Sequence, residues 1–237
     1  SGLPDLGIRS SGGPWRRVNA MNDQAMELSS SATIRHLAAG RREAKVLLPL
    51  FPLLAKGEAL EIDRVSRATG VSAVEIERAA AAGRCERDAD GRLIDLYGMT
   101  LAPTLHRVEA DSKIIYSCCA LWAHVIPKLI EYPVEVESVD PLRRELVRLS
   151  ISPEGVEQVD PIGAMATMVV SGEEEASDDV CASFCCQVRH FVSGESAEEF
   201  AKGSPTREVV DLAQLQEEAD NLYRAIWAVV HSWSDSA

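Results

Sequence analysis

Two short cysteine-bearing stretches organise this chain: Tyr116-Ser117-Cys118-Cys119-Ala120-Leu121-Trp122 and Cys181-Ala182-Ser183-Phe184-Cys185-Cys186. They hold five of its six cysteines. Neither has the C-x2-C spacing with which one turn delivers two thiolates to a tetrahedral zinc ion. Each holds a vicinal pair, of which one sulfur more easily faces a given pocket. Brought together in space, Cys119 and Cys185 would form a two-thiolate site suited to one soft, low-coordinate metal ion.

The composition is that of a globular protein with an acidic surface. The 237 residues suffice for one large domain, or for a medium domain with a small appendage. Hydrophobic residues make up 46% and charged residues 26%, which is ordinary for a folded chain. The net charge of −13 disfavours non-specific binding to nucleic acid or to anionic membranes, because both require positive charge.

The N-terminus and the apolar runs indicate a cytoplasmic location. Residues 1–20 are polar and rich in glycine and serine, unlike a secretory signal, and we interpret them as a leader or an expression remnant before a native start at Met21. The longest mostly apolar run, residues 114–130, is too short to span a bilayer. In a reducing compartment the thiols are expected to be free.

A winged-helix-like subdomain is predicted over residues 33–101. Residues 33–56 and 60–69 have helical patterns, and Ser72-Ala73-Val74-Glu75 is a capping box that opens a further helix. Asp90-Gly91 then predicts a hairpin turn between two short strands. Three helices followed by a two-stranded wing are typical of this class of subdomain.

The helix that would enter a DNA groove has the wrong chemistry for that task. It reads Val74-Glu75-Ile76-Glu77-Arg78-Ala79-Ala80, with two acids and one arginine. Such a surface contacts few phosphates or base edges. We therefore favour a scaffold or dimerisation role and keep a winged-helix regulator as the weaker alternative.

Residues 102–237 are predicted to form the core of the protein. Strands are expected at 105–109, 113–116, 134–139, 146–151, 164–170 and 187–192, and helices at 196–203 and 208–233. Another helix is expected to begin at an N-cap, Ser117, and to kink or end at Pro127. Its first turn would then hold Cys118 and Cys119, where backbone N–H groups stabilise a thiolate.

Other candidate sites are weaker. Cys85 and Cys181 are best explained as small packed side chains. His124 and His190 could approach the cysteines, but packing roles are favoured. The sequence has no Gly-rich phosphate loop and no G-x-S-x-G nucleophile motif. A Cys–His hydrolase stays open, because such a site is assembled in space rather than in sequence.

The cysteine stretches carry a family resemblance. Ile115-Tyr116-Ser117-Cys118-Cys119-Ala120-Leu121 resembles the first active-site segment of the organomercurial (alkylmercury) lyases, and Ser183-Phe184-Cys185-Cys186-Gln187-Val188 resembles the second. Residues 150–153 and 159–166 are similar to the connecting strands of that family. The resemblance covers roughly residues 42–233.

The resemblance implies a fold and an activity. The fold is α+β, with an N-terminal winged-helix-like helical bundle followed by a core of antiparallel sheets with helices. The activity is protonolysis of carbon–mercury bonds without a cofactor, and mercuric reductase is implied as the acceptor of the metal. Cys119 and Cys185 correspond to the two essential thiols: one attacks mercury, the pair chelates it, and the hydrocarbon leaves once its carbon is protonated.

The chain departs from the family at the proton-handling position. Trp122 stands where the family has a catalytic Asp, and an indole has neither an acidic proton nor a ligating oxygen. Asp140 lies near the position of an additional family cysteine, whereas Cys118 is an extra thiol. The loss of the Asp favours retention of a soft metal, mercury or copper, over turnover. Alternatively, the chain is a fold relative whose pocket serves another small molecule.

Two expectations concern the geometry of the site. The sulfurs of Cys119 and Cys185 should share one pocket, while Cys118 and Cys186 should point elsewhere. The thiols of Cys118 and Cys186 are nevertheless the nearest substitutes in sequence for the missing acid. Together with Trp122 they are the predicted accessory residues of the site.

Overall fold

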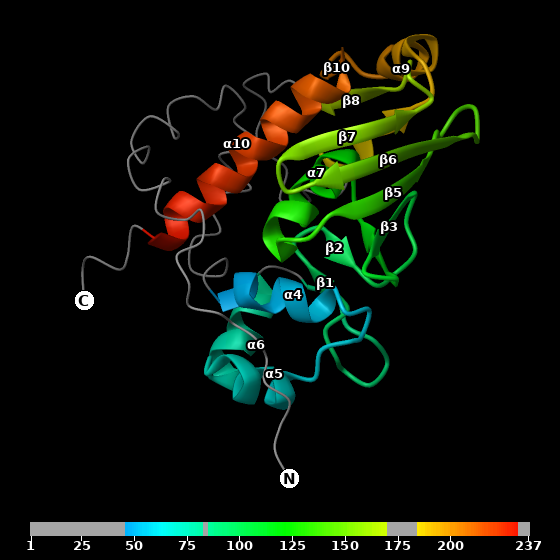
Figure 1. The fold of residues 1–237 in the computed structure, drawn as a ribbon. Helices are drawn as coiled ribbons and strands as arrows, with labels where there is room; N and C mark the ends of the chain where they lie inside the picture. Colours follow the sequence, from blue (N-terminus) through cyan, green and yellow to red (C-terminus); the bar gives the residue numbers. More distant parts are fainter. Residues whose placement is uncertain (1–45, 83–84, 170–183, 232–237) are drawn as a thin grey trace.

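The computed structural model describes residues 46–82, 85–169 and 184–231 (Figure 1). The predicted leader at residues 1–20 and Cys181 lie outside these ranges. The helices are η2 (Leu48–Leu50), α4 (Phe51–Leu54), α5 (Ile62–Thr69), α6 (Ala73–Ala82), α7 (Ala120–Ile130), η3 (Cys185–Gln187), α9 (Gly194–Ala201) and α10 (Leu212–His231). The strands are β1 (Asp95–Leu96), β2 (Met99–Thr100), β3 (His106–Ala110), β4 (Lys113–Ser117), β5 (Val134–Val139), β6 (Leu146–Ser152), β7 (Gly155–Asp160), β8 (Met165–Val169), β9 (His190–Phe191) and β10 (Arg207–Val210).

Two antiparallel sheets form the core. The larger has the strand order β1-β2-β4-β3-β5-β6-β7, and the smaller has the order β10-β8-β9. Strand β5 shows how the sequence selects the buried face: Val134, Val136 and Ser138 are buried, and Glu135 between them is exposed. This period of two is that of a sheet with one face on the core. The predicted α+β arrangement is therefore confirmed.

Helix α7 lies between the large sheet and α10 (Figure 1), in contact with β4, β6 and α10. Residues 120–127 of this helix are all buried. A helix covered on every side needs such a largely apolar sequence, and its N-terminus, which follows the first cysteine pair, is held inside the protein. None of the helices in the described ranges is long and apolar enough to cross a bilayer.

The helices α5 and α6 pack on one another beside the predicted hairpin. The capping box is confirmed: Ser72 Oγ accepts from the Glu75 N–H, and Glu75 Oε2 accepts from the Ser72 N–H, each at 3.3 Å. The hairpin is present as one isolated bridge, Arg87 to Leu93, instead of a regular ladder, and a second bridge joins Leu93 to Leu60 before α5. Gly91 supplies its left-handed turn residue, with φ +81°.

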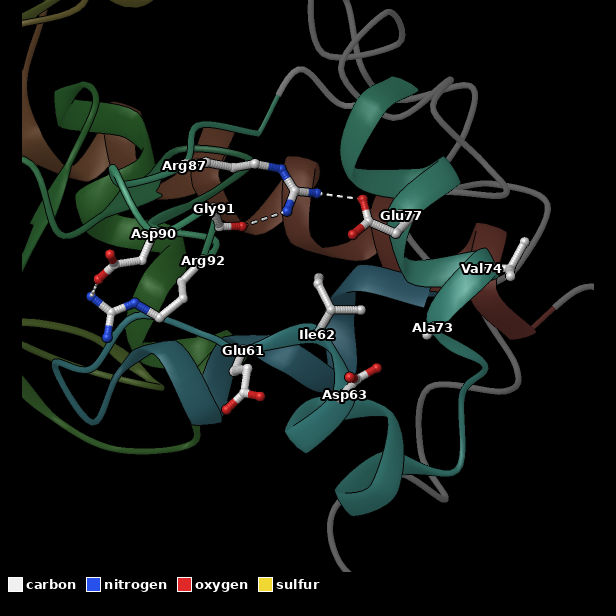
Figure 2. Close-up of a pocket in the computed structure, with 10 residues that line it drawn as sticks. All are labelled: Glu61, Ile62, Asp63, Ala73, Val74, Glu77, Arg87, Asp90, Gly91 and Arg92. Carbon is white, nitrogen blue, oxygen red and sulfur yellow. Dashed lines mark hydrogen bonds and ion pairs between the residues drawn. The ribbon is translucent and has the colours of Figure 1, made fainter.

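A hollow lies between α5, α6 and the turn of the hairpin (Figure 2). Its charged lining residues are Glu61, Asp63, Glu77, Asp90, Arg87 and Arg92. Both arginines are already paired, Arg87 with Glu77 at 2.6 Å and Arg92 with Asp90 at 2.8 Å. The hollow therefore keeps an excess of negative charge and none of its lining residues is a cysteine, so it is unrelated to the thiol chemistry.

Two helix starts differ from the prediction. Helix α7 has Cys119 as its N-cap, and Ser117 is the last residue of β4, paired with Met99 and His106. This strand pairing keeps Ser117 out of the helix. Helix α9 begins at Gly194, before the predicted start at residue 196, because the side chain of its N-cap, Ser193, accepts from the backbone N–H three residues later.

Several strand and helix bounds also differ. The strands predicted between residues 105 and 169 are present as β3, β4, β5, β6 and β8, but β7 was not predicted. The strand predicted at 187–192 is reduced to β9, after η3. Strand β10 occupies the start of the predicted C-terminal helix, and α10 begins after Asp211, whose Oδ1 accepts from the Gln214 N–H at 2.7 Å. Pro127 lies within α7 and does not end it.

Three histidines of the core carry no exposed surface: His106, His124 and His190. Burial is the main cause that lowers the pKa of His106 to about 3 and the pKa of His124 to about 4, and it also lowers the pKa of His190 well below its usual value. The folded protein therefore holds all three as neutral imidazoles.

These neutral histidines predict a loss of stability in mild acid. A histidine in the unfolded chain takes up a proton near pH 6.5, whereas the buried rings stay neutral. The stability that the neutral rings allow is therefore fully present above about pH 6.5 and is lost as the pH falls toward about 4. We expect the free energy of unfolding to fall by on the order of 2 kcal/mol for each of His106 and His124 between about pH 6.5 and about pH 5, and His190 to contribute in the same direction. Urea denaturation at a series of pH values measures it. An unfolding free energy that stays constant over this range would contradict the assignment.

Candidate metal centre

Three cysteine sulfurs lie close together at the junction of β4 with α7, beside η3. The Sγ atoms of Cys118, Cys119 and Cys185 all lie within 4.8 Å of one another. The Sγ atoms of Cys118 and Cys185 are 3.4 Å apart, and these cysteines are free thiols. The expected proximity of the Cys119 and Cys185 sulfurs is therefore confirmed. The expectation that Cys118 points elsewhere is wrong, whereas Cys186 is exposed and lies outside the cluster, as expected.

A bend between β4 and α7 explains the position of Cys118. In a continuing strand, consecutive side chains would point to opposite faces. The chain instead bends at Cys118 and Cys119 before the helix starts. The Cys118 N–H donates to Gly98 O at 2.9 Å, and the Ala120 N–H donates to Val188 O at 3.1 Å. The bend fixed by these bonds leaves both sulfurs in one cluster.

A short 3-10 helix presents the third sulfur. In η3 the Gln187 N–H donates to Phe184 O at 2.9 Å. Successive residues of a 3-10 helix point about 120° apart. Cys185 is accordingly buried and its neighbour Cys186 is exposed. One of the two vicinal thiols of this segment thus enters the site, as the sequence indicated.

The surroundings of the cluster favour a thiolate at Cys119 and protonated thiols at Cys118 and Cys185. Burial opposes a charge on Cys119, but hydrogen bonds from the thiols of Cys118 and Cys185, the backbone N–H of Trp122 and the charge of Arg189 together bring the pKa of Cys119 well below its usual value. The pKa of Cys118 is well above its usual value, because its thiol is bonded to Cys119 and Cys185 and is buried. Cys119 is therefore the thiol of the cluster that most readily loses its proton.

Arg189 is a residue of the site that the sequence reasoning missed. Its Nε donates to Cys186 O at 3.3 Å, and its Nη1 lies 3.5 Å from Cys118 O. The same Nη1 donates to His106 Nε2 at 3.2 Å. Its guanidinium thus touches the backbone of both cysteine segments. In the sequence, the only indication of this role is that Arg189 follows Cys185 by four residues.

Asp95 was also missed. Burial is the main cause that raises its pKa to about 7, with a further contribution from the negative charge of Glu86. Burial, with the charge of Asp95, raises the pKa of Cys85 to about 12. Cys85 is thus a protonated, half-buried thiol packed against the core, as expected for a structural cysteine.

Trp122 fills space beside the cluster. It is 4% exposed and stacks on Phe51 with ring centroids 6.4 Å apart and planes at 13°. Gly98 lies against the indole: a Cβ there would be 2.5 Å from Trp122 Cγ, and φ is +104°. The indole therefore packs α7 against α4 and the turn between β1 and β2. It offers the site no carboxylate.

Asp140, which lies near the expected position of the additional family cysteine, has a structural role. It is fully buried. One carboxylate oxygen accepts from the N–H groups of Leu142 and Arg143, and the other accepts from the N–H of Val192 and the hydroxyl of Ser196. These four bonds join the loop after β5 to α9. They leave this carboxylate fully engaged and outside the thiol cluster.

The histidines do not pair with the cysteines. The ring nitrogens of His124 bond to Gln216 and His190, and those of His106 bond to Ser138 and Arg189. Both ring nitrogens of His190 are occupied as well. These three imidazoles therefore have no free nitrogen with which to activate a thiol, which argues against a Cys–His hydrolase built from them. Their packing role agrees with the sequence interpretation.

The α+β fold carries a cluster of three thiols whose chemistry is compatible with binding of a soft metal ion. Residues 99–224 match the family described as alkylmercury lyase, and residues 28–96 match the helix-turn-helix domain of alkylmercury lyase. The first match alone spans more than half of the chain. The chain therefore belongs to the alkylmercury lyase family, as the two cysteine segments predicted.

Individual relatives agree with this assignment. The alkylmercury lyase of Staphylococcus epidermidis is 32% identical over 163 residues, which cover 68% of this chain and 74% of that protein. The alkylmercury lyase of Streptomyces lividans is 28% identical over 196 residues, covering 81% of this chain and 89% of that protein. Among solved structures, the mercury-bound form of MerB2 matches with a TM-score of 0.66 at 17% identity, covering 82% of this chain and 97% of that one. The structural match supports the fold.

Proposed function

We propose that the thiol cluster captures the mercury of an organomercurial compound, cleaves its carbon–mercury bond slowly and retains the mercuric ion. The observation that carries the proposal is the gathering of the Cys118, Cys119 and Cys185 sulfurs within 4.8 Å. Thiolates are the ligands that soft metal ions prefer. A cluster with one thiolate and two thiols supplies both a nucleophile and protons.

The proposed steps use the cysteines in turn. The Cys119 thiolate bonds to mercury and displaces the counter-ligand of the organomercurial. The Cys118 thiol then gives its proton to the carbon, which keeps the electron pair of the breaking bond and leaves as a hydrocarbon, while the Cys118 sulfur takes its place on mercury. The Cys185 thiol loses its proton to solvent and adds as the third sulfur. No cofactor is needed in this sequence.

The same arrangement explains why turnover would be slow. A thiol with a raised pKa is a reluctant proton donor. Trp122 contributes no acid in place of the family Asp, and three sulfurs hold mercury more firmly than two. Retention of copper is the second candidate function, because a cuprous ion also prefers thiolates. In a cytoplasm, a thiol-rich acceptor such as mercuric reductase would remove the metal.

We propose that residues 33–101 serve as a scaffold for the residue 102–237 core and do not read DNA. The hollow between α5, α6 and the hairpin turn has an excess of acids (Figure 2). Anionic DNA needs positive charge on its partner. We expect fluorescence anisotropy to show no binding to a labelled duplex at low salt. Tight binding that weakens steeply with added salt would instead support the winged-helix regulator.

Phenylmercury tests the proposed function. We expect the native protein to release benzene slowly and to keep one mercuric ion per chain. Cys119→Ser should abolish both, because it removes the nucleophile. Cys118→Ser should abolish benzene release and leave phenylmercury bound through the Cys119 sulfur. Cys186→Ser is the matched control, since that thiol is exposed and outside the cluster, and it should behave as the native protein does.

Trp122→Asp tests the missing acid with the same assay. Restoring the carboxylate should raise benzene release, although loss of the packed indole costs about 3–5 kcal/mol of stability. Trp122→Ala is the control for that cost and should give no gain. Fast release by the native protein would contradict the account of slow turnover. If the native protein neither releases benzene nor binds mercury, the site serves another ligand.

A further inference from the structure

A chain of buried hydrogen bonds begins beside the cysteines. Arg189 Nη1 lies 3.2 Å from His106 Nε2, and His106 Nδ1 lies 2.8 Å from Ser138 Oγ. Ser138 Oγ lies 2.8 Å from His190 Nδ1, and the Nε2 atoms of His190 and His124 are 3.1 Å apart. His106, Ser138, His190 and His124 are all fully buried. The chain therefore runs from the thiol cluster into the core.

At its other end the chain reaches the contact between α7 and α10. His124 Nδ1 lies 2.9 Å from Gln216 Oε1, and Gln216 Nε2 donates to Asp220 Oδ1 at 2.8 Å. Asp220 also pairs with Lys128 at 3.0 Å. The chain thus joins strands of both sheets to both long helices. None of these bonds was predicted from the sequence.

The residues at both ends of this hydrogen-bond chain require the same donor-to-acceptor direction along it. A guanidinium only donates, so His106 Nε2 must accept and the proton of this neutral ring is on Nδ1. His106 then donates to Ser138, whose hydroxyl donates to His190 Nδ1. From the far end, ionised Asp220 only accepts, so Gln216 turns its oxygen to His124, which must carry its proton on Nδ1.

The two halves meet at the pair of Nε2 atoms. His190 carries its proton there and donates it to His124. Every donor along the chain therefore faces an acceptor, with one proton per ring. A second proton on any ring would turn two donors toward each other, which fits the lowered pKa values of these histidines.

Arg189, at the start of this hydrogen-bond chain, joins the two cysteine segments. The Arg189 guanidinium donates to Cys186 O and lies against Cys118 O, one in each cysteine segment. Its backbone is fixed as well: Thr167 N donates to Arg189 O at 3.0 Å, and Arg189 N donates to Thr167 Oγ1 at 3.3 Å. A planar guanidinium keeps its donors in a fixed geometry.

We infer that Arg189 and the histidine–serine chain centred on Ser138 are positioning residues of the thiol centre. They hold the two cysteine segments at the separation at which the three sulfurs bind one soft ion. The chain does this by presenting the His106 Nε2 lone pair to Arg189 and so fixing the guanidinium. The inference rests on the proposed function only for the identity of the ion.

Mutation of Ser138 tests this role. Ser138→Ala should lower the retention of mercuric ion against excess glutathione by about 10- to 100-fold, as loss of an outer-shell partner does at other metal sites. Ser138→Thr keeps the hydroxyl and should restore retention. Ser150→Ala is the matched control: its hydroxyl, on neighbouring β6, bonds to Glu135 at 2.7 Å on the exposed face, so retention should not change.

A double-mutant cycle separates positioning from general destabilisation. Arg189→Gln should weaken retention at least as much as Ser138→Ala, and the double variant should be no worse than Arg189→Gln alone, because both act through one contact. Additive losses, or unchanged retention in Ser138→Ala, would overturn the inference.

NMR of the metal-free protein tests the chain without reference to mercury. We expect nitrogen shifts that place the proton on Nδ1 of His106 and His124 and on Nε2 of His190. Ser138→Ala should speed hydrogen exchange of the Cys118 and Ala120 amides, whereas Ser150→Ala should not. Opposite tautomers or unchanged exchange would refute the positioning role. Failure of the native protein to retain mercuric ion would refute the proposed function but leave these NMR outcomes to decide this inference.

Discussion

Two backbone hydrogen bonds at the junction of β4 and α7 decide where the chemistry of this protein occurs. The Cys118 N–H bonds to Gly98 O, and the Ala120 N–H bonds to Val188 O. They bring the turn between β1 and β2, the first cysteine segment and the residues after the second to one point. The turn can approach so closely because Gly98 has no side chain to meet the indole of Trp122. The sulfur cluster is a consequence of this junction.

Local sequence pattern and family resemblance were sufficient to predict part of the fold and of the site. The alternation of β5, the capping box at Ser72 and the two cysteine segments are each encoded within a few residues, and the predictions made from them are confirmed. The roles of Cys119 and Cys185 stay predictions, although the structure brings their sulfurs together.

The remaining features depend on contacts between distant segments. Ser117 has the chemistry of an N-cap, but strand pairing on both sides keeps it extended. Cys118 was expected to point away because the bend after β4 has no signature in the sequence. Arg189 and Asp95 are ordinary charged residues in the sequence. Only the folded chain places Arg189 against both cysteine segments and surrounds Asp95 closely enough to raise its pKa.

The departures from the family pattern have a common physical effect. At the family's Asp position this chain has a packed indole, and one residue before the first essential cysteine it has a further thiol. The first change removes an acid, and the second adds a soft ligand that is also a weak acid. In the proposed function, both shift the balance from releasing a metal toward holding it. Asp140, at the place of another family cysteine, serves the fold through its four hydrogen bonds.

The central claim is that one soft ion is held by three sulfurs. X-ray absorption at the mercury edge counts the ligands directly, in protein loaded with one equivalent of mercuric ion. The account predicts three sulfur neighbours in the native protein and two in Cys118→Ser. Two sulfur neighbours in both proteins, or nitrogen and oxygen neighbours in the native one, would contradict it.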